Sequence, residues 1–419
     1  MPGSACSAQC FPRTFVTGTV LFYVQQLLGI GHLQRALSLV DAIAREDIAV
    51  TLVLGGVPPP WPISTRAERV VQLTPVSARD ASFKELVGPG GQPIDQKLEK
   101  SRRKALLTAF DAASPDAVVI EAFPFGRRAF RFELEPLLAR ARARRPRPRI
   151  VCSLRDIVVV PDKAARRRDI IDRVRADFDF VLVHGDPDFI PLDESFPAAS
   201  EIANRLIYTG YISGQDQPDA TDETAGADEV LVSVGGGAVG GTLLSTAVEA
   251  RRRGCLNGLT WRLLAGPNLP TETFDGLAGG LPAGVVLERY RREFPQMLRR
   301  CRVSVSQAGY NTILNILAAR VPAVVVPFAS ERETEQQLRA ERLAARGVLE
   351  LVDEADLTPD RLSCAIKRAI ERGPGTISVQ TGGARCAASL IGDMIRDPAS
   401  VIRRQRDFMS RSPGIMIGG

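Results

Sequence analysis

Short apolar runs rich in β-branched residues alternate with helical segments along most of the 419-residue chain, and this alternation limits the possible folds more than any other feature. The run at residues 20–24 is followed by a glycine-containing turn at 28–31 and by a predicted helix at 32–45, where apolar residues recur at helical spacing. A second strand at 49–54 completes a βαβ unit. Continuous apolar strands separated by helices are typical of a parallel sheet that is covered on both faces.

The same pattern runs through two successive series. In the first series, further strands are predicted at 117–120, 150–154 and 180–183, and the sheet is expected to close near 206–211. The second series has strands predicted at 230–234, 260–265, 285–287, 303–305 and 324–326, with helices near 240–253, 293–300, 310–319, 332–346 and 360–372. We therefore predict an α/β protein built from two Rossmann-like, doubly wound parallel-sheet domains.

The boundary between the two series lies in a polar segment. Residues 213–229 are acidic, contain glycine and proline, and have few apolar side chains, which is typical of an interdomain linker. The sequence thus predicts a first domain at 1–212, a linker at 213–229 and a second domain at 230–380. In the remaining segment, 381–419, a helix near 383–395 is expected to pack back on the first domain, and the tail from Ser410 is expected to fray.

Composition narrows the class of protein. Hydrophobic residues make up 45% and charged residues 24% of the chain, and no apolar run approaches the roughly 20 residues that span a bilayer. The first 14 residues lack the apolar core of a signal peptide. The seven cysteines are scattered without a C-x-x-C pair, which argues against a disulfide framework or a zinc site. These features predict a cytoplasmic protein without a metal site.

The formal charge of +6 leaves more than one partner open. A basic solvated surface explains it without a ligand, whereas an anionic nucleotide or membrane surface would be attracted to it. The densest basic stretch, residues 140–147, ends a leucine-bearing helix and suits either peripheral contact with an anionic membrane or simple complementation of the helix dipole. Nucleic-acid binding is not expected, because aromatic residues make up only 6% of the chain and are not interleaved with the basic ones.

Two glycine turns in the second series each open a helix. Residues 304–315 run from a strand through Gly309 into a helix that begins near Asn311 and Thr312. Residues 234–241 place five glycines between the first strand of that series and its first helix. Unpaired N–H groups at such helix starts favour a phosphate, although ordinary N-capping or a flexible glycine turn explains each one singly. Together, the two turns predict a diphosphate site.

His32 is one of only two histidines and follows the first strand, at the edge of the sheet where ligands bind in such folds. Its side chain suits a general base that takes a proton from a hydroxyl group or water, or a residue that positions the acceptor. Glu121 and Asp156 also follow strands, and each either orients His32, lines an acceptor pocket with Gly31, or pairs with a nearby arginine. A loop role is expected for the other histidine, His184.

Three segments of the second half, 306–312, 321–328 and 335–340, resemble the donor-binding signature of GT-B glycosyltransferases. The likeness is greatest to the MurG type, with its glycosyltransferase family 28 C-terminal domain. The turn at 28–32 resembles the start of the acceptor domain in the same group, and it also resembles UDP-sugar hydrolases of nonulosonic acid synthesis. Residues 123–128 resemble an uncharacterised bacterial subgroup of predicted glycosyltransferases.

The resemblance implies a nucleotide-sugar site between two domains that face each other across a cleft. The residues implied to hold the diphosphate are Gly235, Gly236, Gly237, Gly309, Asn311 and Thr312, with Gln307 in the same motif. Those implied to contact the uracil ring are Tyr290 and Arg291, and those implied to bind the sugar are Gln336 and Gln337, with Glu331 and Glu333 as further candidates. At the position where the family has a glutamate on the ribose, this chain has Asn315, which forfeits a charge-assisted hydrogen bond.

The function implied is inverting, metal-independent transfer of a sugar from a nucleotide-sugar, specifically a UDP-sugar, to a hydroxyl acceptor, with His32 as the base. No cofactor is expected beyond this donor substrate, and a cytoplasmic location at the inner membrane face follows from the same group. Two alternatives stay open: hydrolysis or epimerisation of the UDP-sugar, and a nucleotide-sugar-binding protein without turnover, for which Asn315 is the motivating observation.

Overall fold

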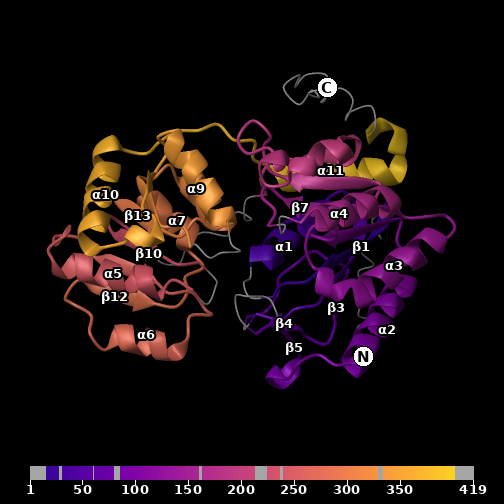
Figure 1. Cartoon of the computed structure of the whole chain (residues 1–419), viewed down its shortest axis with the longest axis horizontal. Helices are drawn as coiled ribbons and strands as arrows, with labels where there is room; N and C mark the ends of the chain where they lie inside the picture. The colour runs from indigo at the N-terminus through magenta and orange to yellow at the C-terminus, as the bar shows by residue number, and fades with distance from the viewer. Residues whose placement is uncertain are drawn as a thin grey trace, which may run out of the picture.

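The computed structural model describes residues 16–27, 31–59, 61–79, 85–159, 163–212, 224–235, 239–328 and 334–401. Two α/β domains lie side by side, the first drawn in indigo to magenta and the second in orange (Figure 1). Each contains a parallel sheet with helices on both faces, as the alternating pattern predicts.

The first sheet has seven strands in the order β3-β2-β1-β6-β7-β8-β9. Each neighbouring pair is parallel. The strands are β1 (Gly18–Val24), β2 (Ile48–Leu54), β3 (Arg69–Gln72), β6 (Ala117–Glu121), β7 (Arg149–Arg155), β8 (Phe180–His184) and β9 (Leu206–Tyr208). The short strands β4 (Ser77–Ala78) and β5 (Leu86–Val87) form a separate antiparallel pair. Strand order reverses between β1 and β6, so the switch point of this sheet lies there.

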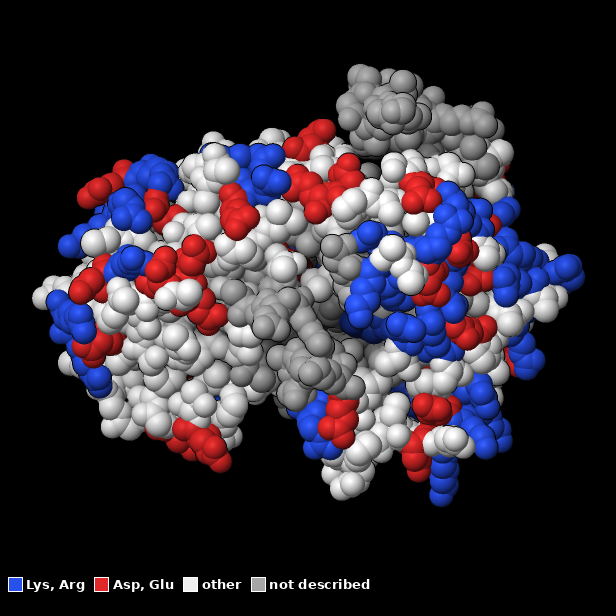
Figure 2. Space-filling view, viewed as in Figure 1, with Lys and Arg blue, Asp and Glu red and all other residues white. Residues whose placement is uncertain are grey.

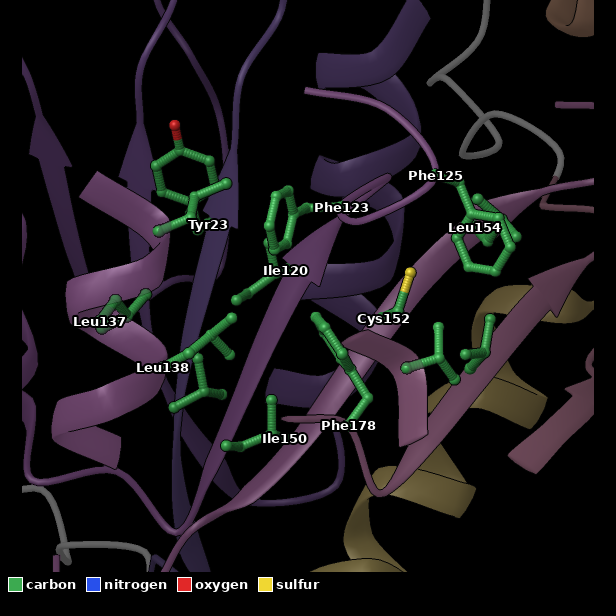
Figure 3. Close-up of a cluster of buried hydrophobic side chains, with 14 of the residues drawn as sticks. Tyr23, Ile120, Phe123, Phe125, Leu137, Leu138, Ile150, Cys152, Leu154 and Phe178 are labelled. Carbon is green, nitrogen blue, oxygen red and sulfur yellow. The ribbon is translucent and has the colours of Figure 1, made fainter. Parts of the chain in front are cut away.

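Helices cover both faces of the first sheet. Buried side chains of α2 (Gln96–Ala113), α3 (Arg131–Ala143) and α4 (Ala164–Asp177) share one apolar core with the sheet. Figure 3 shows part of that core, where Leu137 and Leu138 of α3 lie near Ile120 and Ile150 of the sheet. The opposite face is covered by α1 (Gly31–Ala44) and α11 (Gly383–Arg396).

The second sheet has six parallel strands in the order β12-β11-β10-β13-β14-β15. They are β10 (Val230–Ser233), β11 (Trp261–Leu264), β12 (Val285–Glu288), β13 (Val303–Ser306), β14 (Ala323–Val325) and β15 (Glu350–Leu351). One core contains α7 (Phe294–Arg300), α8 (Tyr310–Ala319) and α9 (Glu335–Ala345). The other contains α5 (Gly241–Arg252) and α10 (Pro359–Arg372), with α6 (Thr271–Ala278) at its margin. The switch point lies between β10 and β13.

The chain between and after the two sheets adds contacts to both domains. Residues 213–223 of the predicted linker lie outside the described residues, but 224–229 pack on the second domain: Ala225 is buried, and Glu229 forms an ion pair with Arg262 at 2.8 Å. Helix α11, drawn in yellow beside the first domain in Figure 1, buries Ala387, Leu390 and Ile391 in the same core as α1. Helix α11 is therefore part of the first domain's core.

The strands and helices expected from the apolar pattern agree with the structure to within one or two residues where both are described, save that β9 ends at Tyr208. The predicted start of the helix at 332–346 falls partly outside the described residues, which resume at Thr334. The pattern did not identify α2, α4, α6, β3 or β15. Helices α2 and α4 contain many charged residues, so few apolar residues remain to show the helical spacing. Strand β15 has only two residues, which is too short for a recognisable pattern.

Candidate functional site

Two residues at the carboxyl ends of the switch-point strands of the first sheet, His32 and Glu121, are in contact. His32 lies in the first turn of α1, directly after β1, and Glu121 is the last residue of β6. The His32 Nδ1 atom is 2.5 Å from Glu121 Oε1. An ionised carboxylate only accepts hydrogen bonds, so Nδ1 carries the proton and Nε2 is left with its lone pair. The carboxyl ends of β1 and β6 thus bring together a candidate base and the carboxylate that orients it.

Two arginines keep Glu121 ionised although it is 1% exposed. Arg35, one turn after His32, donates to Glu121 Oε1, and Arg127 lies 3.7 Å from Oε2. Burial by itself raises the pKa of Glu121, but His32, Arg35 and Arg127 together hold that pKa far below its usual range. Glu121 is therefore a permanent anion that can orient the imidazole.

His32 is neutral at ordinary pH. Burial lowers its pKa to about 4, and the opposing effect of Glu121 does not restore it. The side chain still exposes 21% of its surface, so the ring is not sealed from solvent. A neutral, oriented and partly accessible imidazole can accept a proton through Nε2.

The switch point of the second sheet carries two helix starts without side-chain caps. Helix α8 begins after Gly309 and helix α5 begins after Gly240, and neither N-cap residue has a side chain to cap the helix. The alternative of ordinary N-capping is not seen for α8, because its N-cap residue is Gly309 and no side chain caps the helix. The free N–H groups and the helix dipole are left to favour an anion.

Two buried hydroxyls lie at the ends of the same two strands. Ser233 of β10 and Ser306 of β13 are register partners and are 4% and 0% exposed. Among the residues that the structure describes, neither Oγ atom has a hydrogen-bond partner. Buried polar groups rarely lack partners, so a polar ligand or ordered water is expected near these strand ends.

Helix α8 meets helix α1 across the domain interface. Asn311 Nδ2 donates to Gln34 Oε1 at 3.3 Å, and a β-carbon at Gly31 would lie 3.4 Å from the same nitrogen. The Arg35 guanidinium lies over the ring of Tyr310, with 5.5 Å between Cζ and the ring centroid. The start of the predicted diphosphate helix is therefore brought beside the turn of helix that carries His32.

The two predicted sugar-binding glutamines differ in their surroundings. Gln336 Oε1 accepts from the N–H groups of Ala308 and Phe328, at 3.0 and 3.2 Å, which ties α9 to the loops after β13 and β14. Its amide nitrogen carries two donors of its own. Gln337 Nε2 instead donates to Glu341 and Asp353. The structure thus brings Gln336 to the strand ends beside α8, and it ties Gln337 to acidic groups elsewhere on the domain.

The residues implied to hold a base follow β12. Tyr290 is 38% exposed, and its ring stacks on that of Trp61 from the first domain. Arg291 is not a free base contact, because its guanidinium donates to Glu288 at 2.8 and 2.9 Å. Arg291 therefore fixes the turn that presents Tyr290.

Asp156 does not line an acceptor pocket, because its side chain is fully buried. Its carboxylate accepts from Arg339 of α9, with the shortest separation 2.9 Å, and Tyr211 donates to it. Glu335, in the same helix turn as Arg339, pairs with Arg155 at 2.6 Å. The predicted pairing of Asp156 with an arginine is right in kind, but the partner comes from the other domain.

His184 makes structural hydrogen bonds, as expected, but it is the last residue of β8 and does not lie in a loop. It is fully buried, with Nε2 2.8 Å from Ser153 Oγ and Nδ1 2.9 Å from Thr209 Oγ1. Its backbone oxygen accepts from the Tyr310 hydroxyl at 3.0 Å, and this hydroxyl also accepts from the N–H of Ile212. Tyr310, the first residue of α8, thereby connects the second domain to the first by hydrogen bonds.

Four further predicted site residues lie near the switch point of the second sheet. Gly235 has a φ of 70°, which suits its position in the turn after β10. Thr312 and Asn315 are half-buried on α8, and Gln307 is buried, with its N–H bonded to the carbonyl of Ser233. Gly236, Gly237, Glu331, Glu333 and residues 28–30 lie outside the described residues.

The sequence alone did not identify Trp61, Tyr310, Glu335 or Arg339 as interface residues. Trp61 had one available signal, because it is one of only two tryptophans and sits in a proline-rich segment. Arg35, which follows the turn at 28–32 in the sequence, is a partner of Glu121. In the described part of the chain, no group of three or more His, Cys, Asp or Glu side chains is arranged to hold a metal ion.

Comparison with known proteins finds a family model that matches the second domain. Residues 231–378 match the model of the glycosyltransferase family 28 C-terminal domain. A UDP-N-acetylglucosamine–N-acetylmuramyl-(pentapeptide) pyrophosphoryl-undecaprenol N-acetylglucosamine transferase of Exiguobacterium sibiricum is 26% identical over 172 residues, 40% of this chain and 47% of that protein. The enzyme of the same name from Corynebacterium efficiens is 30% identical over 170 residues, 40% of this chain and 44% of that protein. The match thus spans less than half the length of either relative.

Solved structures extend the likeness to both domains. MurG of Acinetobacter baumannii aligns over 90% of this chain and 100% of its own, with a TM-score of 0.54 and 14% identity. The spinosyn forosaminyltransferase SpnP aligns over 94% of this chain and 99% of its own, with a TM-score of 0.56 and 15% identity. The chain has the GT-B fold, and the predicted resemblance to MurG-type glycosyltransferases is confirmed. Among helices in the described ranges, none has the length and apolar character needed to cross a bilayer.

Proposed function

Because residues 231–378 match the glycosyltransferase family 28 C-terminal domain within a GT-B fold, we propose that this chain transfers a sugar from a nucleotide-sugar to a hydroxyl acceptor. The observation that carries the proposal is the contact between α1 and α8, the helices that follow a switch-point strand in the first and in the second sheet. The oriented His32 lies on α1, whose Gln34 contacts Asn311 in the first turn of uncapped helix α8. A base and an anion-binding helix start are thereby neighbours.

The proposed reaction uses each part of this arrangement. The diphosphate of the donor binds at the starts of α8 and α5, where N–H groups and helix dipoles stabilise the charge that develops on the leaving group. No metal ion or other cofactor is needed in this scheme. The acceptor hydroxyl enters from the first domain and gives its proton to His32 Nε2. Attack opposite the leaving diphosphate is a single displacement, so the anomeric configuration is inverted.

The pH dependence of kcat/KM is expected to lack a limb near pH 6.5. His32 acts in its neutral form, and burial lowers its pKa to about 4, so the base stays deprotonated at any pH well above 4. Activity is therefore expected to stay level as the pH falls from 8 to 5 and to decline near pH 4. A decline centred near pH 6.5 that vanishes when His32 is replaced would contradict this assignment.

The proposed donor is a UDP-sugar, and Asn315 is the residue that tests this choice. A glutamate on α8 would accept a charge-assisted hydrogen bond from a ribose hydroxyl, which the neutral amide does not provide. Asn315→Glu is therefore expected to raise the affinity for UDP roughly fivefold, equivalent to about 1 kcal/mol. Calorimetric titration measures the change. Inorganic pyrophosphate, which has no ribose, is the control ligand. Unchanged UDP affinity would remove Asn315 from the ribose site.

The experiment that tests the function is nucleotide release from a panel of UDP- and dTDP-sugars, with and without candidate hydroxyl acceptors. Release that requires an acceptor supports transfer. Release without an acceptor, abolished in His32→Ala, would assign hydrolysis instead, and tight binding without release would assign a binding protein. If the chain binds no nucleotide-sugar, then transfer, hydrolysis and a binding role are all contradicted.

Peripheral contact with an anionic membrane is part of the proposal, and α2 is a better candidate surface than residues 140–147. In that stretch Arg140, Arg142 and Arg147 pair with acidic side chains. Lys100, Arg103 and Lys104 of α2 line a surface pocket of about 290 Å³, and Arg140 and Asp111 complete its charged lining. Figure 2 shows Lys and Arg side chains gathered over the first domain. Clustered cations of this kind are attracted to anionic lipid headgroups.

A further inference from the structure

An aromatic pair joins the two domains at the edge of the proposed donor site. Trp61 lies in the loop between β2 and β3 of the first domain, and Tyr290 follows β12 of the second. Their ring centroids are 5.1 Å apart and their planes differ by 4°. Two side chains from different domains are therefore held as parallel rings, an arrangement that matches the shape of a flat ligand.

The first domain holds Trp61 in a stiff segment. Prolines precede it at positions 58, 59 and 60 and follow it at 62. Proline fixes its own φ and restricts the residue before it, so such a run has few conformations to lose on binding. Upstream of the prolines, the carbonyl of Val57 accepts from Gln26 Nε2 at 3.0 Å, which ties the loop to the end of β1. The indole is thus presented with little conformational freedom.

The second domain holds Tyr290 from both sides. Arg289 Nη1 donates to the carbonyl of Leu269 at 2.9 Å, and the Arg289 guanidinium lies 4.3 Å from the ring centroid of Phe274. Arg291 is bound by Glu288. With both neighbours fixed, Tyr290 still exposes 38% of its surface although Trp61 covers one face. This exposure leaves apolar ring surface available to a ligand.

The position of the pair relative to the diphosphate site fits a nucleotide. Strand β12 lies two strands from β10 in the second sheet, and the diphosphate is proposed at the β10–β13 switch point. Neighbouring strands are about 4.8 Å apart, so the end of β12, which Tyr290 follows, lies about 12 Å along the sheet edge from that point. An extended nucleoside diphosphate spans a gap of this order from its diphosphate, through the ribose, to its base. The aromatic pair therefore lies where the base of a bound nucleotide would reach.

We propose that Trp61, from the first domain, binds the nucleobase of the donor together with Tyr290 by stacking. The inference rests on the proposed function and adds a base-binding residue from the opposite domain. The base enters between the two rings, whose centroids must then part from 5.1 Å to about 7 Å, twice a normal stacking distance. Because each ring belongs to a different domain, donor binding and domain orientation become coupled.

Calorimetric titration of UDP into the full chain tests the inference. Trp61→Ala is expected to weaken UDP binding at least about fivefold, because aromatic stacking contributes to the binding of a base. Trp61→Phe keeps a ring and is expected to recover part of the loss. Val57→Ala is the matched control: it removes an exposed apolar side chain from the same loop, 55% exposed, and should bind UDP as the wild type does.

Two further readouts separate base binding from a structural role. Inorganic pyrophosphate, added as a competitor of UDP, is expected to bind the wild type and Trp61→Ala equally, since it has no base. UDP is expected to change the tryptophan fluorescence of the wild type but not of Trp61→Phe, whose remaining Trp261 is fully buried. Equal UDP affinity in the wild type and Trp61→Ala would overturn the inference. So would a loss of pyrophosphate affinity in Trp61→Ala as large as its loss of UDP affinity. Either result would leave the proposed function standing. A wild type that binds neither UDP nor dTDP would overturn the proposed function as well.

Discussion

Replacing His32 with alanine is expected to lower kcat by about 10²–10⁴-fold, the usual contribution of a general base. His32 Nδ1 is bound by Glu121, so Nε2 is the atom left to take the acceptor's proton. The affinity for UDP is expected to stay at the wild-type value, because the diphosphate binds at α8 and α5 on the other domain. Single-turnover sugar transfer measures the rate, and calorimetry measures the affinity.

The distinction between catalysis and folding needs a second variant. His32→Asn keeps a polar side chain of similar volume but cannot act as a base near neutral pH, so its kcat is expected to match that of His32→Ala. The midpoint of thermal unfolding is the control for the fold. Transfer by either variant at more than about a tenth of the wild-type rate would remove His32 from the catalytic step.

Replacing Arg339 with alanine is expected to cost about 3–5 kcal/mol of the free energy of unfolding. Arg339 is 1% exposed and pairs with Asp156 and Glu335, which are 0% and 4% exposed. Its removal leaves Asp156 buried, with the Tyr211 hydroxyl at 3.3 Å as the one remaining side-chain donor among the described residues. An uncompensated buried carboxylate is among the most costly defects in a folded protein.

Arg342→Ala is the matched control for this prediction, because Arg342 also crosses the domain interface. It pairs with Glu194 at 2.7 Å, but the two side chains are 45% and 23% exposed. Exposed pairs contribute little, so the expected loss is below about 1 kcal/mol. Urea unfolding compares the two variants. Equal losses would show that the Asp156–Arg339 pair does not hold the domains together.

The fold was largely predictable because apolar strands in parallel sheets form continuous runs. Val20–Val24 and Val230–Ser233 are such runs, and each is followed by glycine and a helix start, which locates both switch points from the sequence. His32 and Asn311 were predicted as site residues for the same reason, since ligands in these sheets lie beyond the carboxyl ends of the strands.

Contacts between the domains were not predictable from local pattern. Arg339 and Asp156 are 183 residues apart, and no periodicity in either segment indicates that they meet. The stacking of Trp61 on Tyr290 depends likewise on how two separately folded sheets face each other. The ion pair of Arg291 with Glu288, three residues earlier, was likewise not predicted, because only the turn after β12 determines the direction of the two side chains.

The central claim is that a pyrophosphate binds between the starts of α8 and α5 and faces His32 from the other domain. A crystal structure of the chain with UDP tests it most directly. The predicted result is a diphosphate within hydrogen-bond distance of N–H groups in the first turn of α8, with His32 Nε2 pointing toward the β-phosphate side. UDP bound elsewhere, or His32 Nε2 pointing away from the nucleotide, would contradict the account.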